Sequence, residues 1–117
     1  MKAKKVIIAG CRTYRNYEQL KAALNQVLTN GVEEIVSGGA KGTDQLGERY
    51  AREHQIPLKR FPANWQKYDK LAGPIRNREM ASYADAAIIF WDGKSKGTRD
   101  MIRAARAAGL SIRVFGI

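Results

Sequence analysis

Short, uninterrupted apolar runs alternate along the chain with longer stretches that have helical periodicity. The first run lies in Lys5 to Gly10 and reads Val-Ile-Ile-Ala without a polar break, as expected for a strand buried on both faces of a parallel sheet. Further apolar runs predict strands at Val32 to Ser37, Leu58 to Phe61, Ala86 to Trp91 and Leu110 to Phe115. Helical spacing predicts helices at Tyr17 to Asn30, Thr43 to His54, Pro74 to Tyr83 and Thr98 to Ala108. Because strands alternate with helices, we predict an α/β fold of about five mainly parallel strands with helices on both faces.

The composition is that of one globular domain spanning residues 1–117. Hydrophobic residues make up 44% of the chain and charged residues 27%, which suits a soluble domain with one core. Cys11 is the only cysteine, so no internal disulfide is possible, and one cysteine with one histidine predicts no metal cluster. The apolar run from Val6 to Ala9 is too short for a signal peptide or membrane helix, so we expect a cytoplasmic protein without membrane contact.

Basic residues outnumber acidic ones by 21 to 11, which gives a formal net charge of +10. Such a charge attracts polyanions over roughly 10 Å at moderate salt, so nucleic acid is a candidate partner. The basic residues are spread along the chain, however, and no zinc finger, basic zipper or RNA-binding signature occurs. Arg99, Arg103 and Arg106 form the best local stripe for such a surface, on one face of the last predicted helix. A diffuse positive field serves a small phosphorylated ligand equally well.

A glycine-rich stretch, Ser-Gly-Gly-Ala-Lys-Gly-Thr-Asp, joins the strand ending at Ser37 to the next helix. Glycines permit positive φ and bring main-chain N–H groups close to a ligand, and the start of a helix favours an anion. Thr43 or Asp44 is positioned to cap the helix. The stretch predicts a phosphate cradle, with a plain strand-to-helix turn as the alternative, and it has neither Walker A nor G-x-G-x-x-G spacing. The candidate binding residues in it are Gly38, Gly39, Lys41, Gly42, Thr43 and Asp44.

Two further segments carry candidate phosphate-binding groups. Arg76 and Arg78 stand in the first turns of the helix after Gly73-Pro74, where they could act on a phosphate together with the helix dipole, although solvated arginines explain them equally. Asp92 to Thr98 is a second glycine-containing loop before a helix, suited to phosphate or sugar, or simply to a turn and a cap. Because parallel strands end at one edge, we expect these segments to converge there with Gly10 to Thr13.

The longest irregular segment is expected from Pro62 to Ala72, and it contains Trp65. Trp65 has two interpretations. It stacks on a purine base, worth about 1–3 kcal/mol per base in nucleic-acid systems, or it anchors the loop on the core. Cys11 follows the first strand, where burial explains it better than nucleophilic catalysis, because no histidine is near in sequence.

Five motifs follow one another along the chain: Gly10-Cys11-Arg12, Ser37 to Asp44, Phe61 to Trp65, Ala72 to Met80, and Gly97-Thr98. Together they resemble the SLOG superfamily over nearly the whole chain, and most closely its small stand-alone YspA-type, YpsA-related branch. The resemblance implies a Rossmann-like fold that binds a nucleotide or a nucleotide-derived ligand. Relatives include the cytokinin-activating phosphoribohydrolases, the DNA-processing protein DprA, and sensor domains of antiviral systems that read ADP-ribose-like signals.

One position departs from the phosphoribohydrolase pattern, in which a late Pro-Gly-Gly-x-Gly-Thr-x-x-Glu motif supplies a catalytic glutamate. Arg76 stands where an assisting arginine would lie, but Met101 occupies the place of the glutamate. A methionine neither stabilises an oxocarbenium-like sugar nor takes a proton. Asp100, Asp44 and Asp92 are the other carboxylates that could act, so the sequence leaves open whether the chain is an enzyme.

These observations lead to three hypotheses. The preferred one is a sensor or sequestering protein for an ADP-ribose-like or cyclic nucleotide, with a homo-oligomer allowed and no resident cofactor or metal expected. The others are a hydrolase of the nucleotide N-glycosidic bond and a nucleic-acid-binding module. The expected ligand-binding residues are Gly10, Arg12, Gly38, Gly39, Lys41, Gly42, Thr43, Asp44, Trp65, Arg76, Asn77, Asp92, Ser95, Gly97 and Thr98.

Overall fold

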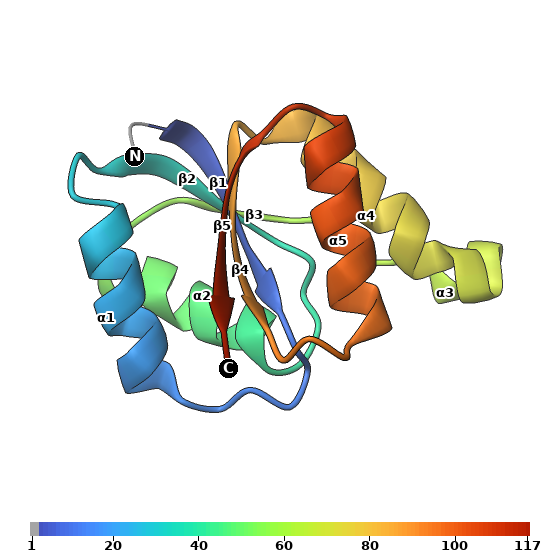
Figure 1. Ribbon diagram of the computed structural model, residues 1–117. Coiled ribbons are helices and arrows are strands. Elements are labelled where there is room, and N and C mark those ends of the chain that lie inside the picture. The colour runs from blue at the N-terminus through green and yellow to red at the C-terminus, as the bar shows by residue number, and fades with distance from the viewer. Residues whose placement is uncertain (1–2) are drawn as a thin grey trace.

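A parallel sheet forms the centre of the fold. The structure is a computed structural model that describes residues 3–117. The strands in these residues are ordered β3-β2-β1-β4-β5, and every neighbouring pair runs parallel. Helices cover both faces of the sheet (Figure 1), which confirms the predicted Rossmann-like α/β fold. The strands are β1 (Ala3–Gly10), β2 (Val32–Ser37), β3 (Leu58–Arg60), β4 (Ala86–Trp91) and β5 (Ser111–Gly116).

The residues of β1 alternate between two layers of core. Val6 and Ile8 pack with α1 (Tyr17–Val27) and α2 (Thr43–Glu53), while Ile7 and Ala9 pack with α4 (Ala72–Tyr83) and α5 (Lys96–Ala107), and all four side chains are buried. Burial on both faces is why this strand has no polar position between them. Within residues 3–117, no helix has both the length and the hydropathy of a membrane span. The long helices are α1, α2, α4 and α5.

The strand order reverses between β1 and β4. From β1 the chain moves outward through β2 to β3, and it then returns to place β4 on the other side of β1. Gly10 pairs with Phe90 at the carboxyl ends of these two strands. The chain leaves β1 toward α1 on one face of the sheet and leaves β4 toward α5 on the other face. A crevice opens between two such connections, and open α/β sheets bind ligands there.

Each of the four long helices differs from its predicted bounds, and α2 differs least, ending at Glu53 rather than His54. Helix α1 ends at Val27 rather than Asn30, and a turn then leads to Gly31 with φ +82°. Helix α4 begins at Ala72, so Pro74 lies in its first turn. A proline is tolerated there because its missing N–H would have no intrahelical acceptor.

The segment from Pro62 to Ala72 was predicted to be irregular, which is correct for residues 62–64 and wrong from Trp65 onward. It contains the short helix α3 (Trp65–Tyr68) and the 3-10 helix η1 (Asp69–Leu71), which runs directly into α4. Asn64 caps α3, because its side chain accepts a hydrogen bond from the Lys67 N–H at 3.1 Å. In Figure 1, α3 projects beyond the outer end of α4, away from the sheet.

Candidate functional site

A cleft with two adjoining lobes lies at the carboxyl ends of the strands. The first lobe has a volume of about 410 Å³ and the second about 400 Å³, which is within the usual range of small-molecule sites. Segments after β1, β2 and β4 line it together with the starts of α4 and α5. The lobes share a wall made of Arg12, Ala40, Trp65 and Arg76.

Most of the expected ligand-binding residues line this cleft. Gly42 and Thr43 do not line it, because they join α2 to the loop after β1. Thr43 Oγ1 donates to the Cys11 carbonyl at 2.9 Å, and a Cβ on Gly42 would lie 2.3 Å from the Arg12 carbonyl oxygen. The second lobe contains Gly38, Gly39 and Lys41. The first lobe contains Gly10, Asp44, Asn77, Asp92, Ser95, Gly97 and Thr98.

The glycine-rich loop uses several of its own N–H groups within the protein. Helix α2 begins after Gly42, which has φ +77°, and no side chain caps it, so the predicted cap by Thr43 or Asp44 was wrong. The loop therefore presents fewer N–H groups to a ligand than its glycines suggest, and side chains supply much of the polarity of the cleft. Its internal hydrogen bonds run from Gly39 N–H to Ser37 Oγ (3.1 Å), from Ala40 N–H to Asp44 Oδ2 (3.0 Å) and from Thr43 N–H to the Cys11 carbonyl (3.2 Å).

Arg76 lies in the wall that the two lobes share. Its Nη1 donates to the Gly38 carbonyl at 2.7 Å and its Nε donates to Asn77 Oδ1 at 3.1 Å. Within residues 3–117, its Nη2 makes no hydrogen bond. Burial lowers the pKa of Arg76; the charge of Asp44 opposes this, and the charge of Arg12 adds to it. Arg76 is therefore a partly buried cation whose Nη2 is available to donate a hydrogen bond to a group in the cleft.

Asp44 is only 6% exposed and lines the first lobe. Its Oδ2 accepts the Ala40 N–H, whereas its Oδ1 makes no hydrogen bond in the described part of the chain. Burial raises the pKa of Asp44 to about 6, although the hydrogen bond from Ala40 and the charge of Arg76 act in the opposite direction. A Cβ on Gly38 would lie 2.6 Å from Arg76 Nη1 and 3.0 Å from Asp44 Oδ2. The two charged groups thus stand close together around Gly38.

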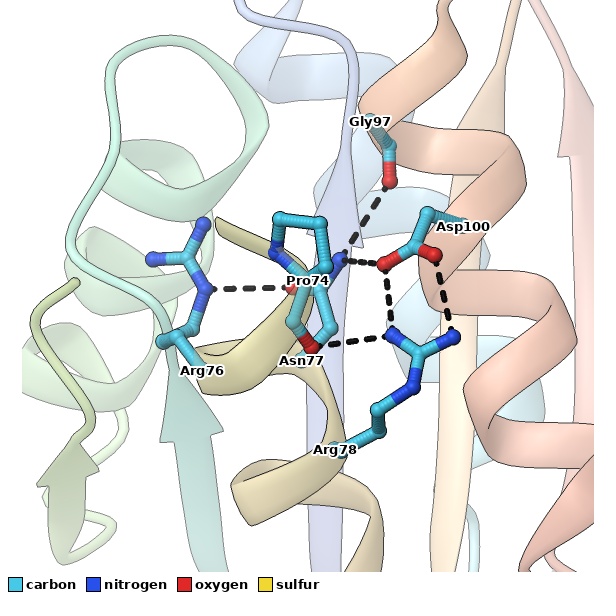
Figure 2. A network of polar contacts seen from close by, with 6 residues as sticks. All are labelled: Pro74, Arg76, Asn77, Arg78, Gly97 and Asp100. Carbon is cyan, nitrogen blue, oxygen red and sulfur yellow. Dashed lines mark hydrogen bonds and ion pairs between the residues drawn. The ribbon is translucent and has the colours of Figure 1, made fainter. Parts of the chain in front are cut away.

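Asn77 connects Arg76 to α5 (Figure 2). Its Nδ2 donates to Asp100 Oδ2 at 2.9 Å, and Arg78 reaches both carboxylate oxygens of Asp100, at 3.0 and 3.1 Å. Burial raises the pKa of Asp100, but the hydrogen bonds from Arg78 and Asn77 outweigh it and leave the pKa lowered. Figure 2 shows the Arg76 guanidinium pointing away from Asp100 and Arg78. Asp100 therefore holds Asn77 rather than lining the cleft.

The start of α5 forms another part of the first lobe. Asp92 accepts hydrogen bonds from two N–H groups of the loop that follows it, and these lower its pKa. Ser95 is the N-cap and accepts the Thr98 N–H at 3.3 Å, so the helix begins two residues before the predicted start at Thr98. Gly97 borders open space, because a Cβ built there meets no atom within 4 Å. The first turn of α5 is thus accessible from the cleft.

Trp65 and Cys11 differ in accessibility. Trp65 is 51% exposed, lines both lobes and belongs to neither cluster of buried core residues. Its ring borders α4, where a Cβ on Gly73 would lie 3.6 Å from Trp65 Cη2.

Cys11 is buried, as expected, and burial raises the pKa of its thiol. A buried thiol with a raised pKa is a poor nucleophile.

Comparisons with known proteins agree with this architecture. A family model described as "YspA, cpYpsA-related SLOG family" matches residues 4–68. The Gene 61 protein of Mycobacterium phage D29 is 31% identical over 121 residues, covering 97% of this chain and 97% of that protein. The chain belongs to the YspA, cpYpsA-related SLOG family.

Two solved structures share the fold of this SLOG chain. DprA from Streptococcus pneumoniae has a TM-score of 0.75 at 18% identity, and the match covers 95% of this chain but 49% of that one. DprA from Helicobacter pylori, in a study of its single-stranded DNA binding mode, has a TM-score of 0.68 at 23% identity, with coverages of 95% and 64%. The SLOG chain therefore spans between about half and two-thirds of these DprA chains.

The carboxylates that the sequence offered for hydrolysis all have protein hydrogen-bond partners in this SLOG chain. Met101, at the glutamate position, is buried, contributes to the core between α5 and the sheet, and also lines the first lobe. Asp100 is bound by Arg78 and Asn77, while Asp92 holds its own loop. Among the described residues, no group of three or more histidine, cysteine, aspartate and glutamate side chains could hold a metal ion.

Sequence reasoning did not assign several residues that line the cleft. Most are small or apolar, so they carry no chemical signal, and only their nearness to the predicted motifs pointed to them. In the first lobe they are Ala9, Cys11, Thr13, Ala40, Gly73, Pro74 and Met101, and in the second they include Pro62 and Ala63.

Proposed function

We propose that this SLOG protein binds a nucleotide or nucleotide-derived ligand in the two-lobed cleft, as a sensor or sequestering protein and without hydrolysing it. Membership of the SLOG family and the position of the cleft at the switch in strand order both support such a ligand. Binding without hydrolysis is supported by Met101, because its thioether cannot exchange a proton at the position of the catalytic glutamate.

The observation that carries the proposal is the pair formed by Asp44 and Arg76. Asp44 is buried and Arg76 is partly buried, and each has one atom, Oδ1 or Nη2, that makes no hydrogen bond within the described residues. No fully buried side-chain nitrogen or oxygen among the described residues lacks a partner, so these two atoms are accessible rather than buried, and they favour a ligand that offers both a donor and an anionic acceptor. A sugar hydroxyl donating to Asp44 and a phosphate oxygen accepting from Arg76 satisfy both requirements in one molecule.

Two other parts of the cleft suit the rest of a nucleotide. The exposed ring of Trp65 offers a face on which a base can stack. The first turn of α5 can hold sugar oxygens, because the Gly97 N–H makes no hydrogen bond within the described residues, whereas those of Ser95 and Thr98 are used by Asp92 and Ser95.

The experiment that tests the proposal is native mass spectrometry after incubation with a pool of AMP, ADP-ribose, NAD and cyclic nucleotides. We expect an intact ligand in the complex and in the material released on denaturation. Free base in solution together with a retained ribose phosphate would contradict the sensor proposal and indicate hydrolysis. Absence of any adduct would contradict nucleotide binding.

The residue test is Arg76→Ala, measured by titration calorimetry with the ligand so found. Loss of a charged hydrogen bond is worth about 1.5–3 kcal/mol, so affinity should fall about 10- to 150-fold. Arg52→Ala is the matched control, because Arg52 is exposed on α2, lines neither lobe and carries the same charge. Equal affinities of the two variants would show that Arg76 does not contribute to ligand binding.

A second candidate function is binding of single-stranded nucleic acid by the basic surface of α5. Arg99, Arg103 and Arg106 are exposed there, and none forms an ion pair within residues 3–117. The net charge of +10 and the structural similarity to the DprA of Helicobacter pylori support this candidate. It predicts oligonucleotide affinity that falls steeply with salt and is lost when the three arginines become alanine. Salt-independent binding would exclude it.

A further inference from the structure

The second lobe has a different chemical character from the first. The titratable side chains on its walls are all cationic, namely Arg12, Lys41 and Arg76. The first lobe shares Arg12 and Arg76 but also contains the carboxylates of Asp44 and Asp92. An anion entering the second lobe therefore meets positive charge without a facing carboxylate.

Two of these cations lack a protein acceptor. Within the described residues, neither the Arg12 guanidinium nor the Lys41 ammonium makes a side-chain hydrogen bond or ion pair. Exposed arginines elsewhere, such as Arg99 and Arg103, also lack ion-pair partners within the described residues, so the second lobe differs in that its cations line one cavity. The cations of the second lobe are thus available to a ligand.

The cations also repel one another. Burial lowers the pKa of Arg76, and the charge of Arg12 across the shared wall adds to this lowering, although the opposing effect of the Asp44 charge is larger than that of Arg12. An anion bound between the two guanidinium groups relieves this repulsion and gains hydrogen bonds that involve charged partners. The shared wall therefore suits a first phosphate, and the lobe beyond it, toward Lys41, suits a second.

We infer that the second lobe is a diphosphate subsite, so that the protein selects a diphosphate-bearing nucleotide over a mononucleotide or a cyclic mononucleotide. This inference rests on the proposed function, because the nucleoside of the same ligand occupies the first lobe. One phosphate lies at the shared wall beside Arg12 and Arg76, and the next extends to Lys41. The carboxylates of Asp44 and Asp92 line the first lobe and repel a phosphate, so this lobe suits sugar hydroxyls instead.

The test compares adenosine, AMP, cyclic AMP, ADP and inorganic pyrophosphate by titration calorimetry on the wild type, Lys41→Ala and Arg52→Ala. We expect ADP to bind at least about tenfold more tightly than AMP or cyclic AMP in the wild type and in Arg52→Ala. Lys41→Ala should remove most of the preference for ADP over AMP while leaving adenosine affinity unchanged. Pyrophosphate should bind the wild type and bind Lys41→Ala several-fold more weakly.

The outcomes separate the two proposals. Equal affinities for AMP and ADP, or a loss in Lys41→Ala that is the same for adenosine and ADP, would overturn the diphosphate subsite and leave nucleotide binding standing. Pyrophosphate binding that depends on Lys41, without binding of any nucleotide, would support the subsite and contradict the proposed function. Absence of binding by both pyrophosphate and ADP would overturn the subsite.

Discussion

Arg76 donates a hydrogen bond of 2.7 Å to the backbone carbonyl of Gly38, a residue 38 positions earlier in the chain. The contact joins the start of α4 to the loop after β2, and it leaves no room for a side chain at residue 38. A Cβ on Gly38 would lie 2.6 Å from Arg76 Nη1 and 3.0 Å from Asp44 Oδ2. The absence of a side chain at this glycine thus determines where two charged groups stand in the cleft.

Gly38→Ala should displace Arg76 from its position. The atoms that the new Cβ meets are the ends of two flexible side chains, so they move aside at small cost in stability, but we expect a loss of ligand affinity approaching that of Arg76→Ala. Urea unfolding and titration calorimetry measure the two effects. Gly116→Ala is the control, because a Cβ at that glycine in β5 meets no atom within 4 Å. Full ligand affinity in Gly38→Ala would show that Arg76 does not need this position.

Asp44→Asn should change how folding stability depends on pH. The pKa of Asp44 is raised from 3.8 to about 6, first by burial, so the folded state holds this proton more tightly than the unfolded chain does. The contribution of this proton to the free energy of unfolding is fully present below pH 3.8 and is lost as the pH rises through about 6. At about 1.4 kcal/mol per unit, the loss is at most about 3 kcal/mol. Asparagine has no such proton, so the variant should lack this loss.

Urea unfolding at pH 4, 5, 6 and 7 measures this difference. We expect the free energies of unfolding of the wild type and Asp44→Asn to diverge in favour of the variant as pH rises. Glu33→Gln, at an exposed position of β2, is the matched control and should run parallel to the wild type. Parallel curves for Asp44→Asn would contradict a raised pKa.

Asp100→Ala should weaken ligand binding without touching the cleft. The Asp100 carboxylate accepts a hydrogen bond from Asn77 Nδ2, and Asn77 Oδ1 accepts one from Arg76 Nε. Loss of the carboxylate therefore frees the Asn77 side chain, which orients Arg76. We expect a several-fold loss of affinity, smaller than that of Arg76→Ala, because one orienting contact remains at Gly38. Calorimetry at neutral pH measures it, with Arg103→Ala as the exposed control on the same helix. A loss as large as that of Arg76→Ala would place Asp100 in direct contact with ligand.

Met101→Glu should destabilise the protein rather than create a hydrolase. Met101 is 2% exposed among the apolar residues between α5 and the sheet, and an unpaired carboxylate there costs several kcal/mol. Met101→Leu keeps the volume and should cost less than about 1.5 kcal/mol. Thermal unfolding compares the two variants, and release of free base from nucleotides measures activity. Base release by a stably folded Met101→Glu would show that only the glutamate was missing.

Local sequence patterns predicted the sheet well because each signal is carried by consecutive residues. The apolar run of β4 predicted Ala86 to Trp91, which are the observed bounds, and Val32 to Ser37 was equally accurate for β2. The loop before α4 was predicted poorly. Its helices depend on the Asn64 cap and on packing against α4, neither of which produces an apolar period.

The sequence by itself determined the order of strands and helices, the family and the segments that line the cleft, because these depend on short runs and ordered motifs. Only the tertiary structure decided what each residue does there. It assigned Gly42 and Thr43 to packing, used the N–H groups of the glycine-rich loop within the protein, and brought Asp44 beside Arg76. The physical reason is that hydrogen bonds and burial depend on distances between segments far apart in the chain, which no local pattern records.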